Sequence, residues 1–186
     1  MKKSKLTARD SLRVSVICAF LSALSIVLGK YLAINIGEVL RISFENMPII
    51  FAGIAFGSIC GMATAVVADL VGCMLVGYAI NPIVTLGAAV IGAAAGIYRL
   101  LPKMSGGVSR FVRVAVSVFF SHFLGSILIK TAGLAAFYEM PYIILLLWRA
   151  LNYLMVGVLE CAIIFLLLKN NRIRLEIKKI NGGRSV

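Results

Sequence analysis

Asp69 and Arg149 are opposite charges set inside two separate apolar segments of the sequence. An ionised side chain at membrane depth costs at least ~2.5 kcal/mol on insertion scales, so such residues face a protein interior or a polar cavity and usually have a partner. Counting along ideal helices puts both charges about 12 Å below the same membrane face. We interpret them as the polar centre of a ligand site. The alternative is a structural ion pair between two helices, although buried pairs contribute little net stability.

Further polar side chains fall near this depth. His122 is about as deep in the fifth apolar segment, Asn81 and Thr85 are one turn apart on a helix face, and Asn152 lies one turn beyond the buried arginine. The pattern predicts a cavity open to the outside. A lone histidine here is more often a hydrogen-bonded interior residue, and we interpret Glu160, nearer the cytoplasm, as a structural or partner-facing charge.

The same groups could also perform acid–base chemistry. In a small intramembrane enzyme, Asp69, His122 and Arg149 would serve as acid, base and anion clamp. The sequence lacks the HExxH, GxSxG and GxxxxGK[ST] motifs, and its four cysteines show no CxxC or Cys/His spacing. We therefore expect no catalytic residue, no metal site and no cofactor, and any ATP-driven work needs another subunit.

Aromatic side chains are expected at the same level. Phe44 precedes the second apolar segment, Tyr78 precedes the fourth, and Tyr142 and Trp148 lie in the last. Their rings would supply stacking faces for a ligand. Trp and Tyr are also enriched as anchors at the membrane interface, and for Tyr142 this alternative stays open.

The composition is that of an integral membrane protein. Of the 186 residues, 61% are hydrophobic, and the mean hydropathy is +1.03. Apolar stretches recur at roughly the 20-residue length that crosses ~30 Å of hydrocarbon. About six crossings fill the chain, so we expect one membrane domain over residues 1–186 and no soluble catalytic domain.

We interpret the net charge of +12 as a signal of membrane topology rather than of a nucleic-acid-binding surface. Fifteen of the 19 Lys and Arg residues lie before the first apolar segment, around residues 98–113, or after the last segment. The positive-inside rule puts these three regions in the cytoplasm, which requires an even number of crossings. The sequence therefore predicts an all-α bundle of six transmembrane helices with both termini inside.

Turn signals divide the chain into these crossings. Asn81-Pro82 is typical of a helix cap and first helical residue, and Gly57-Ser58 is typical of a tight turn. A signal peptide at the N-terminus is an alternative for the first segment, but no exported soluble domain follows it. The expected spans are 12–34, 48–57, 58–76, 81–101, 109–130 and 140–168.

Small residues recur every fourth position in three segments. Such spacing lets helix backbones approach closely in a membrane. The sets Gly57, Gly61, Ala65 and Ala88, Gly92, Gly96 are best explained by packing within the bundle. Ala19 and Ala23 share the spacing; spacing alone favours internal packing for them too, and docking of a helix from another protein is the alternative.

Two runs resemble a known family: FENMPIIFAG at residues 44–53 and DLVGCMLVGYAINPIVTLGA at residues 69–88. They look like the folate-specific substrate-binding subunit, or S component, of energy-coupling-factor (ECF) vitamin transporters. The resemblance covers essentially the whole chain. It implies capture of folate or a reduced folate from outside a bacterial cell membrane. It also implies docking through Ala19 and Ala23 to a transmembrane coupling subunit driven by two cytoplasmic ATPases, followed by inward release.

The chemistry of folate then assigns roles to the candidate residues. A carboxylate can accept two N–H groups from the pterin edge, and aromatic rings can stack on the flat parts of the ligand. The outer loops 35–46 and 77–80 would form a lid. We expect Asp69, Asn81, Thr85, Arg149 and Asn152 on the pterin, Phe44, Tyr78 and Trp148 against the rings, and Arg41, Lys30 or Lys130 near the mouth for the glutamyl carboxylates.

Two rival functions remain at this stage. Another vitamin, such as thiamine, riboflavin or pantothenate, could be the ligand of the same scaffold. The small intramembrane enzyme is the rival from a different class. A self-contained channel is disfavoured, because the polar groups gather near one face while Ala and Gly fill the inner half of residues 58–101.

Overall fold

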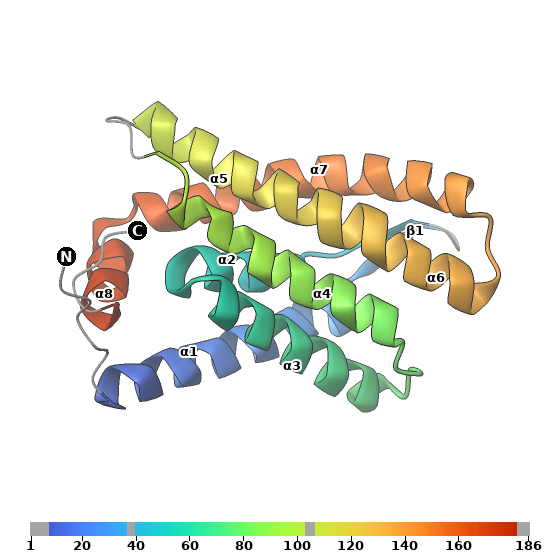
Figure 1. Cartoon of the computed structure of the whole chain (residues 1–186), viewed down its shortest axis with the longest axis horizontal. Coiled ribbons are helices and arrows are strands. Elements are labelled where there is room, and N and C mark those ends of the chain that lie inside the picture. The colour runs from blue at the N-terminus through green and yellow to red at the C-terminus, as the bar shows by residue number, and fades with distance from the viewer. Residues whose placement is uncertain (1–7, 37–39, 103–106, 182–186) are drawn as a thin grey trace.

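The computed structural model describes residues 8–36, 40–102 and 107–181. Within these residues the chain is helical apart from a two-stranded hairpin, and five helical stretches are long and apolar enough to cross a membrane. The protein is therefore a multi-pass membrane protein (Figure 1). The stretches are Ala8–Tyr31, Ser58–Val76, Pro82–Arg99, Val108–Tyr138 and Tyr142–Lys169.

The first crossing joins α1 (Ala8–Ile26) to a π-helical turn, η1 (Val27–Tyr31). A hairpin follows, in which β1 (Ile34–Ile36) pairs antiparallel with β2 (Leu40–Ile42). We expected an irregular polar loop here. The alternation of apolar and polar residues from Ile34 to Ile42 is the pattern that allows two short strands to pair.

The short helix α2 (Asn46–Phe56) precedes α3 (Ser58–Val76). With 11 residues α2 spans about 16 Å at the helical rise, well short of ~30 Å of hydrocarbon. The expected count of six crossings is therefore not established. Gly57 turns the chain between the two helices with a positive φ of 102° that glycine adopts without strain.

The next crossing consists of α4 (Pro82–Ala95) and the 3₁₀ turn η2 (Gly96–Arg99). The predicted cap at its start is confirmed, because Asn81 Oδ1 accepts hydrogen bonds from the backbone N–H groups of Ile83 and Val84. α4 contacts both α2 and α3. An added Cβ on Gly92 would lie 2.1 Å from the backbone oxygen of Gly61, so glycines allow this close approach, as the spacing predicted.

One continuous rod follows, made of α5 (Gly107–Ser121), the π-helical segment η3 (His122–Ile129) and α6 (Lys130–Tyr138). The expected span ended at residue 130, which was wrong. Lys130 lies inside the rod because its charge has a partner within the bundle, so it does not end the helix.

The C-terminal part consists of α7 (Tyr142–Lys169) and α8 (Asn171–Ile180). α8 was not expected. It is amphipathic: Ile177 and Ile180 are buried while its lysines are exposed. α8 contacts α1, and Figure 1 shows it at the same end of the molecule as the start of α1.

Ala19 and Ala23 are exposed on α1 rather than packed inside the bundle. The expectation of internal packing for this pair is therefore wrong. The neighbouring Phe20 is also exposed, at 68%. The buried side of α1 instead holds Ser22 and Ser25, whose hydroxyls donate hydrogen bonds to backbone oxygens of Thr64 and Glu45.

Candidate functional site

A cavity of about 530 Å³ lies among the ends of α3, α4, α6 and α7, beside the hairpin. This volume is within the ~300–1,000 Å³ range of small-molecule sites. Residues far apart in the sequence line it, from Lys30 in η1 to Tyr153 in α7. Six of the predicted site residues are part of its lining: Asp69, Tyr78, Asn81, Trp148, Arg149 and Asn152.

The carboxylate of Asp69 is oriented by a neighbouring helix. Thr85 Oγ1 donates a hydrogen bond of 2.6 Å to Asp69 Oδ2, which joins α3 to α4. A hydrogen bond to an ionised group is stronger than a neutral one, so this contact restricts the carboxylate's rotation. Thr85 is not itself among the residues that line the cavity. Its position supports Asp69 and leaves Oδ1 available to accept hydrogen bonds from a ligand.

The guanidinium of Arg149 is held by a backbone carbonyl. Its Nε and Nη2 atoms both donate to the oxygen of Ser126, at 3.2 and 3.0 Å. Arg149 and Asp69 do not form an ion pair, which removes the hypothesis that they pin two helices together. Counting residues along ideal helices gives the depth of each charge in the membrane. It does not give the direction in which each side chain points.

The buried ion pair in this region instead joins Lys130 to Glu45. Lys130 Nζ lies 3.3 Å from Glu45 Oε1, and the two side chains are 7% and 23% exposed. We expected Lys130 near a solvated mouth, and this was wrong. Glu45 belongs to the sequence run at residues 44–53, but we assigned it no role from the sequence. Its position one residue before an apolar helix is the signal that could have identified it as a partner for a buried cation.

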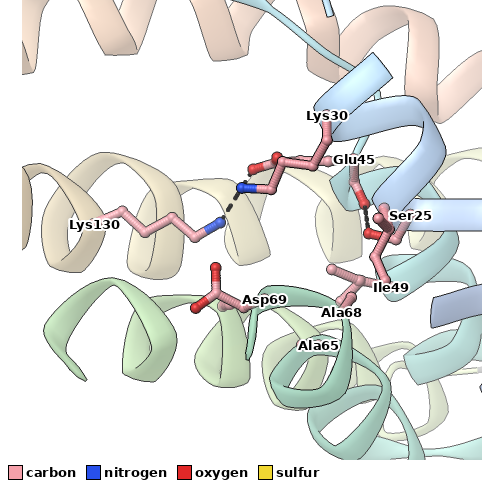
Figure 2. A pocket seen from close by; sticks show the side chains of 10 residues that line it. Ser25, Lys30, Glu45, Ile49, Ala65, Ala68, Asp69 and Lys130 are labelled. Carbon is pink, nitrogen blue, oxygen red and sulfur yellow. Dashed lines mark hydrogen bonds and ion pairs between the residues drawn. The ribbon is translucent and has the colours of Figure 1, made fainter. Parts of the chain in front are cut away.

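A second, water-sized chamber of about 20 Å³ continues from the cavity floor. Figure 2 shows that Lys30, Lys130, Glu45 and Asp69 point toward one another around it. All four also line the larger cavity. Together with Arg149 they give the cavity three cationic and two anionic groups, so the floor carries both hydrogen-bond acceptors and a surplus of positive charge.

Aromatic rings form part of the cavity wall. Trp148 is 43% exposed and Tyr78 is 58% exposed, and Lys30 Nζ lies 5.3 Å from the Tyr78 ring centroid. Tyr142 is not part of the lining, and neither is Phe44, which is half-buried. Of the ring contacts we expected, those of Tyr78 and Trp148 are therefore the ones with access to a ligand.

Three other candidates differ in what they can offer a ligand. Asn81 lines the cavity, but its oxygen caps α4 and its nitrogen donates to Gly133 O at 2.9 Å, so its polar atoms already hold the fold. Asn152 is 6% exposed and reaches the wall. Arg41 belongs to β2, and its side chain lies outside the described part of the structure.

His122 does not join this group. It is 1% exposed, it is absent from the cavity lining, and its Nε2 lies 2.6 Å from Glu160 Oε2. The constellation needed for acid–base catalysis by Asp69, His122 and Arg149 is therefore not assembled. Among the described residues there is also no group of three or more His, Cys, Asp or Glu side chains that could hold a metal.

These features define a class of protein: a multi-pass membrane protein with a cavity of small-molecule size at one end of its bundle. The family model described as "ECF transporter, substrate-specific component" matches residues 13–168, so the chain belongs to the family of ECF transporter S components. Members of this family are substrate-binding transport subunits.

Two solved structures have a similar fold. One is described as the crystal structure of FolT bound with folic acid; it is 21% identical, the match covers 81% of this chain and 88% of that one, and the TM-score is 0.64. The other is described as the S component of a bacterial ECF transporter; it is 19% identical, with 90% and 99% coverage and a TM-score of 0.66. No curated protein sequence matches this chain. At these identities the structures show the fold alone.

Proposed function

We propose that this chain is the folate-binding S component of an ECF transporter and captures folate or a reduced folate from outside a bacterial cell. The observation that carries the proposal is the cavity of about 530 Å³ lined by Asp69, Arg149, Tyr78 and Trp148. It combines an oriented acceptor, a donor held in place and two aromatic faces. The sequence run at residues 69–88 and the similarity in fold to a protein solved with folic acid support the same ligand.

The chemistry of each group suits one part of folate. The Asp69 carboxylate accepts two N–H groups from the pterin edge, and Arg149 donates to the pterin carbonyl oxygen. Asn152 pairs with the remaining edge, while Trp148 and Tyr78 stack on the rings. The surplus positive charge favours an anionic ligand, and Lys30, with Arg41 in the hairpin, would meet the glutamyl carboxylates.

The transport step requires partners. We infer that Ala19 and Ala23 form the face of α1 that docks to the transmembrane coupling subunit, because both are exposed and small. Two cytoplasmic ATPases would drive inward release. The chain would lie in the bacterial cell membrane as a single domain with both termini in the cytoplasm, and it would bind no nucleic acid.

A second vitamin is the nearest alternative ligand. The identity to the solved structures is 19–21%, which leaves the substrate within the family open. Thiamine, riboflavin and pantothenate are the candidates, since S components share one scaffold. These three vitamins differ from folate in the hydrogen-bonding groups and in the charge that they would present to the cavity.

The deciding experiment is a ligand screen on purified protein in detergent. Thermal shift with each vitamin, followed by fluorescence titration of Trp148, should select folic acid. Asp69→Asn should weaken folic acid binding by at least ~100-fold, because two hydrogen bonds to a charged group are worth roughly 1.5–3 kcal/mol each. Glu176→Gln, which alters an exposed carboxylate on α8, is the matched control. Stabilisation by another vitamin and not by folic acid would overturn the assignment.

A further inference from the structure

Behind the cavity wall lies a polar chain that the proposed function does not use. Glu160, His122 and Ser126 are each at most 1% exposed and none of them lines the cavity. Glu160 Oε1 has no hydrogen-bond partner in the part of the chain that the structure describes. Burying a carboxylate in this way is unfavourable, so the arrangement calls for a reason other than stability.

The chain of contacts begins at Glu160 and fixes the ring of His122. Nε2 of His122 lies 2.6 Å from Glu160 Oε2, and Nδ1 lies 3.1 Å from Ser126 Oγ. Tyr153 stacks on the same ring at 4.8 Å with an interplanar angle of 27°. Because both nitrogens and one face are engaged, the imidazole has one orientation, and it fixes the Ser126 side chain in turn.

The π-helical register of η3 then connects Ser126 to Arg149. In an α-helix the amide of Lys130 would donate to the oxygen of Ser126, but here it donates to Gly125. The Ser126 oxygen is free of that amide and accepts two hydrogen bonds from Arg149. Thr131 Oγ1 donates to the same oxygen at 3.3 Å. The irregular turn thus supplies the acceptor that holds the guanidinium.

The two ends of the chain of contacts come from one helix. Arg149, Tyr153 and Glu160 follow one face of α7, at steps of four and seven residues. Arg149 faces the cavity and Glu160 lies about three turns further along α7, and both are joined to η3. His122 and Ser126 therefore connect Glu160 to Arg149. Tyr153 forms a second connection, because its ring stacks on His122 and its hydroxyl lies 3.5 Å from Arg149 Nη2.

We propose that Glu160 and His122 are positioning residues that hold Arg149 toward the ligand through Ser126. The inference rests on the proposed function, since it concerns the affinity of the same cavity. Neither residue touches the ligand. Their role is to keep the π-helical turn and the Ser126 carbonyl in one arrangement, so that the guanidinium is already oriented before a ligand enters.

The experiment measures folic acid affinity through Trp148, the single tryptophan of the sequence and part of the cavity wall. Glu160→Ala should weaken binding about tenfold, the size typical of coupling within one hydrogen-bond network. Glu160→Gln, which still accepts from His122, should restore affinity to within about twofold. A residue that only supports folding would change the melting temperature and leave the Kd of the folded protein unchanged.

A matched serine pair keeps the test decisive if Glu160→Ala fails to fold. Ser126→Ala removes the hydroxyl that contacts His122 and should weaken binding roughly fivefold. Ser117→Ala removes an equally buried hydroxyl, which donates to Arg113 O in its own helix and has no other partner among the described residues, and should leave the Kd unchanged. Equal affinities for these two variants would overturn the proposal.

A double-mutant cycle tests whether the effect passes through Arg149. In an Arg149→Lys background, Glu160→Ala should cost less than about twofold, because the group that it positions is already altered. A full tenfold loss in that background would overturn the proposed route. Binding of folic acid by the wild-type protein is measured first, so a wrong ligand is recognised separately, and the same ratios are then measured with the vitamin that the screen selects.

Discussion

The ion pair between Lys130 and Glu45 gives a prediction whose size follows from its geometry. At 3.3 Å and an effective dielectric constant of ~20, the attraction between the charges is roughly 5 kcal/mol. Desolvation offsets much of this, so the pair itself adds little stability. Removing one partner is different, because breaking a buried pair from one side costs ~3–5 kcal/mol.

Lys130→Met is the informative substitution. The Lys130 stem lies against Gly87, where an added Cβ would be 2.7 Å from Cγ, and methionine keeps that contact while removing the charge. Glu45 would then lie near Asp69 with no cation bound to it from α6. Because the Glu45 side chain is 23% exposed, we take the lower end of the range and expect a loss of about 3 kcal/mol in the free energy of unfolding.

The assay is equilibrium unfolding by SDS in mixed micelles without ligand, since a bound vitamin would add its own stabilisation. The double variant Lys130→Met with Glu45→Gln removes both charges of the pair and should recover to within about 1 kcal/mol of wild type. A loss below ~0.5 kcal/mol for the single variant would refute the reasoning. So would a double variant that is as unstable as the single one.

Three further predictions concern helix packing, the ligand and docking. Gly92→Ala should lower unfolding free energy by ~2 kcal/mol, measured in the same SDS assay, because its Cβ would meet the backbone of α3. Thr85→Val should weaken folic acid binding about tenfold in a Trp148 titration by releasing Asp69, and an unchanged Kd would contradict this. Ala23→Trp should block ATP-driven uptake in proteoliposomes while binding persists; Leu154→Trp, exposed on α7, is the control.

Local signals in the sequence predicted the elements that depend on local chemistry. The expected crossing at residues 58–76 has the same bounds as α3, and the Asn81-Pro82 cap starts α4 as expected. Gly57 turns the chain where the sequence indicated. These features follow from backbone freedom, capping and apolar length, each of which involves only a few neighbouring residues.

The partners of the buried charges could not be predicted in the same way. Helix counting gave the depth of Asp69 and Arg149, but the contacts of buried charges depend on the rotation of each helix. The π-helical turn η3 changes that rotation within the rod, and no sequence pattern announces it. Glu45 and Ser126 therefore became visible as partners only in three dimensions.

The end of α2 depends on a residue far along the chain. Ala55 O accepts a hydrogen bond from Asn181 Nδ2 at 2.8 Å, across 126 positions, and a second from Arg99 Nη2. Asn181 follows α7 in the chain, so its hydrogen bond can form only after the whole of α7 has been synthesised. This end of α2 thus depends on the C-terminal part of the chain, which supplies one of the two side-chain hydrogen bonds to the Ala55 oxygen.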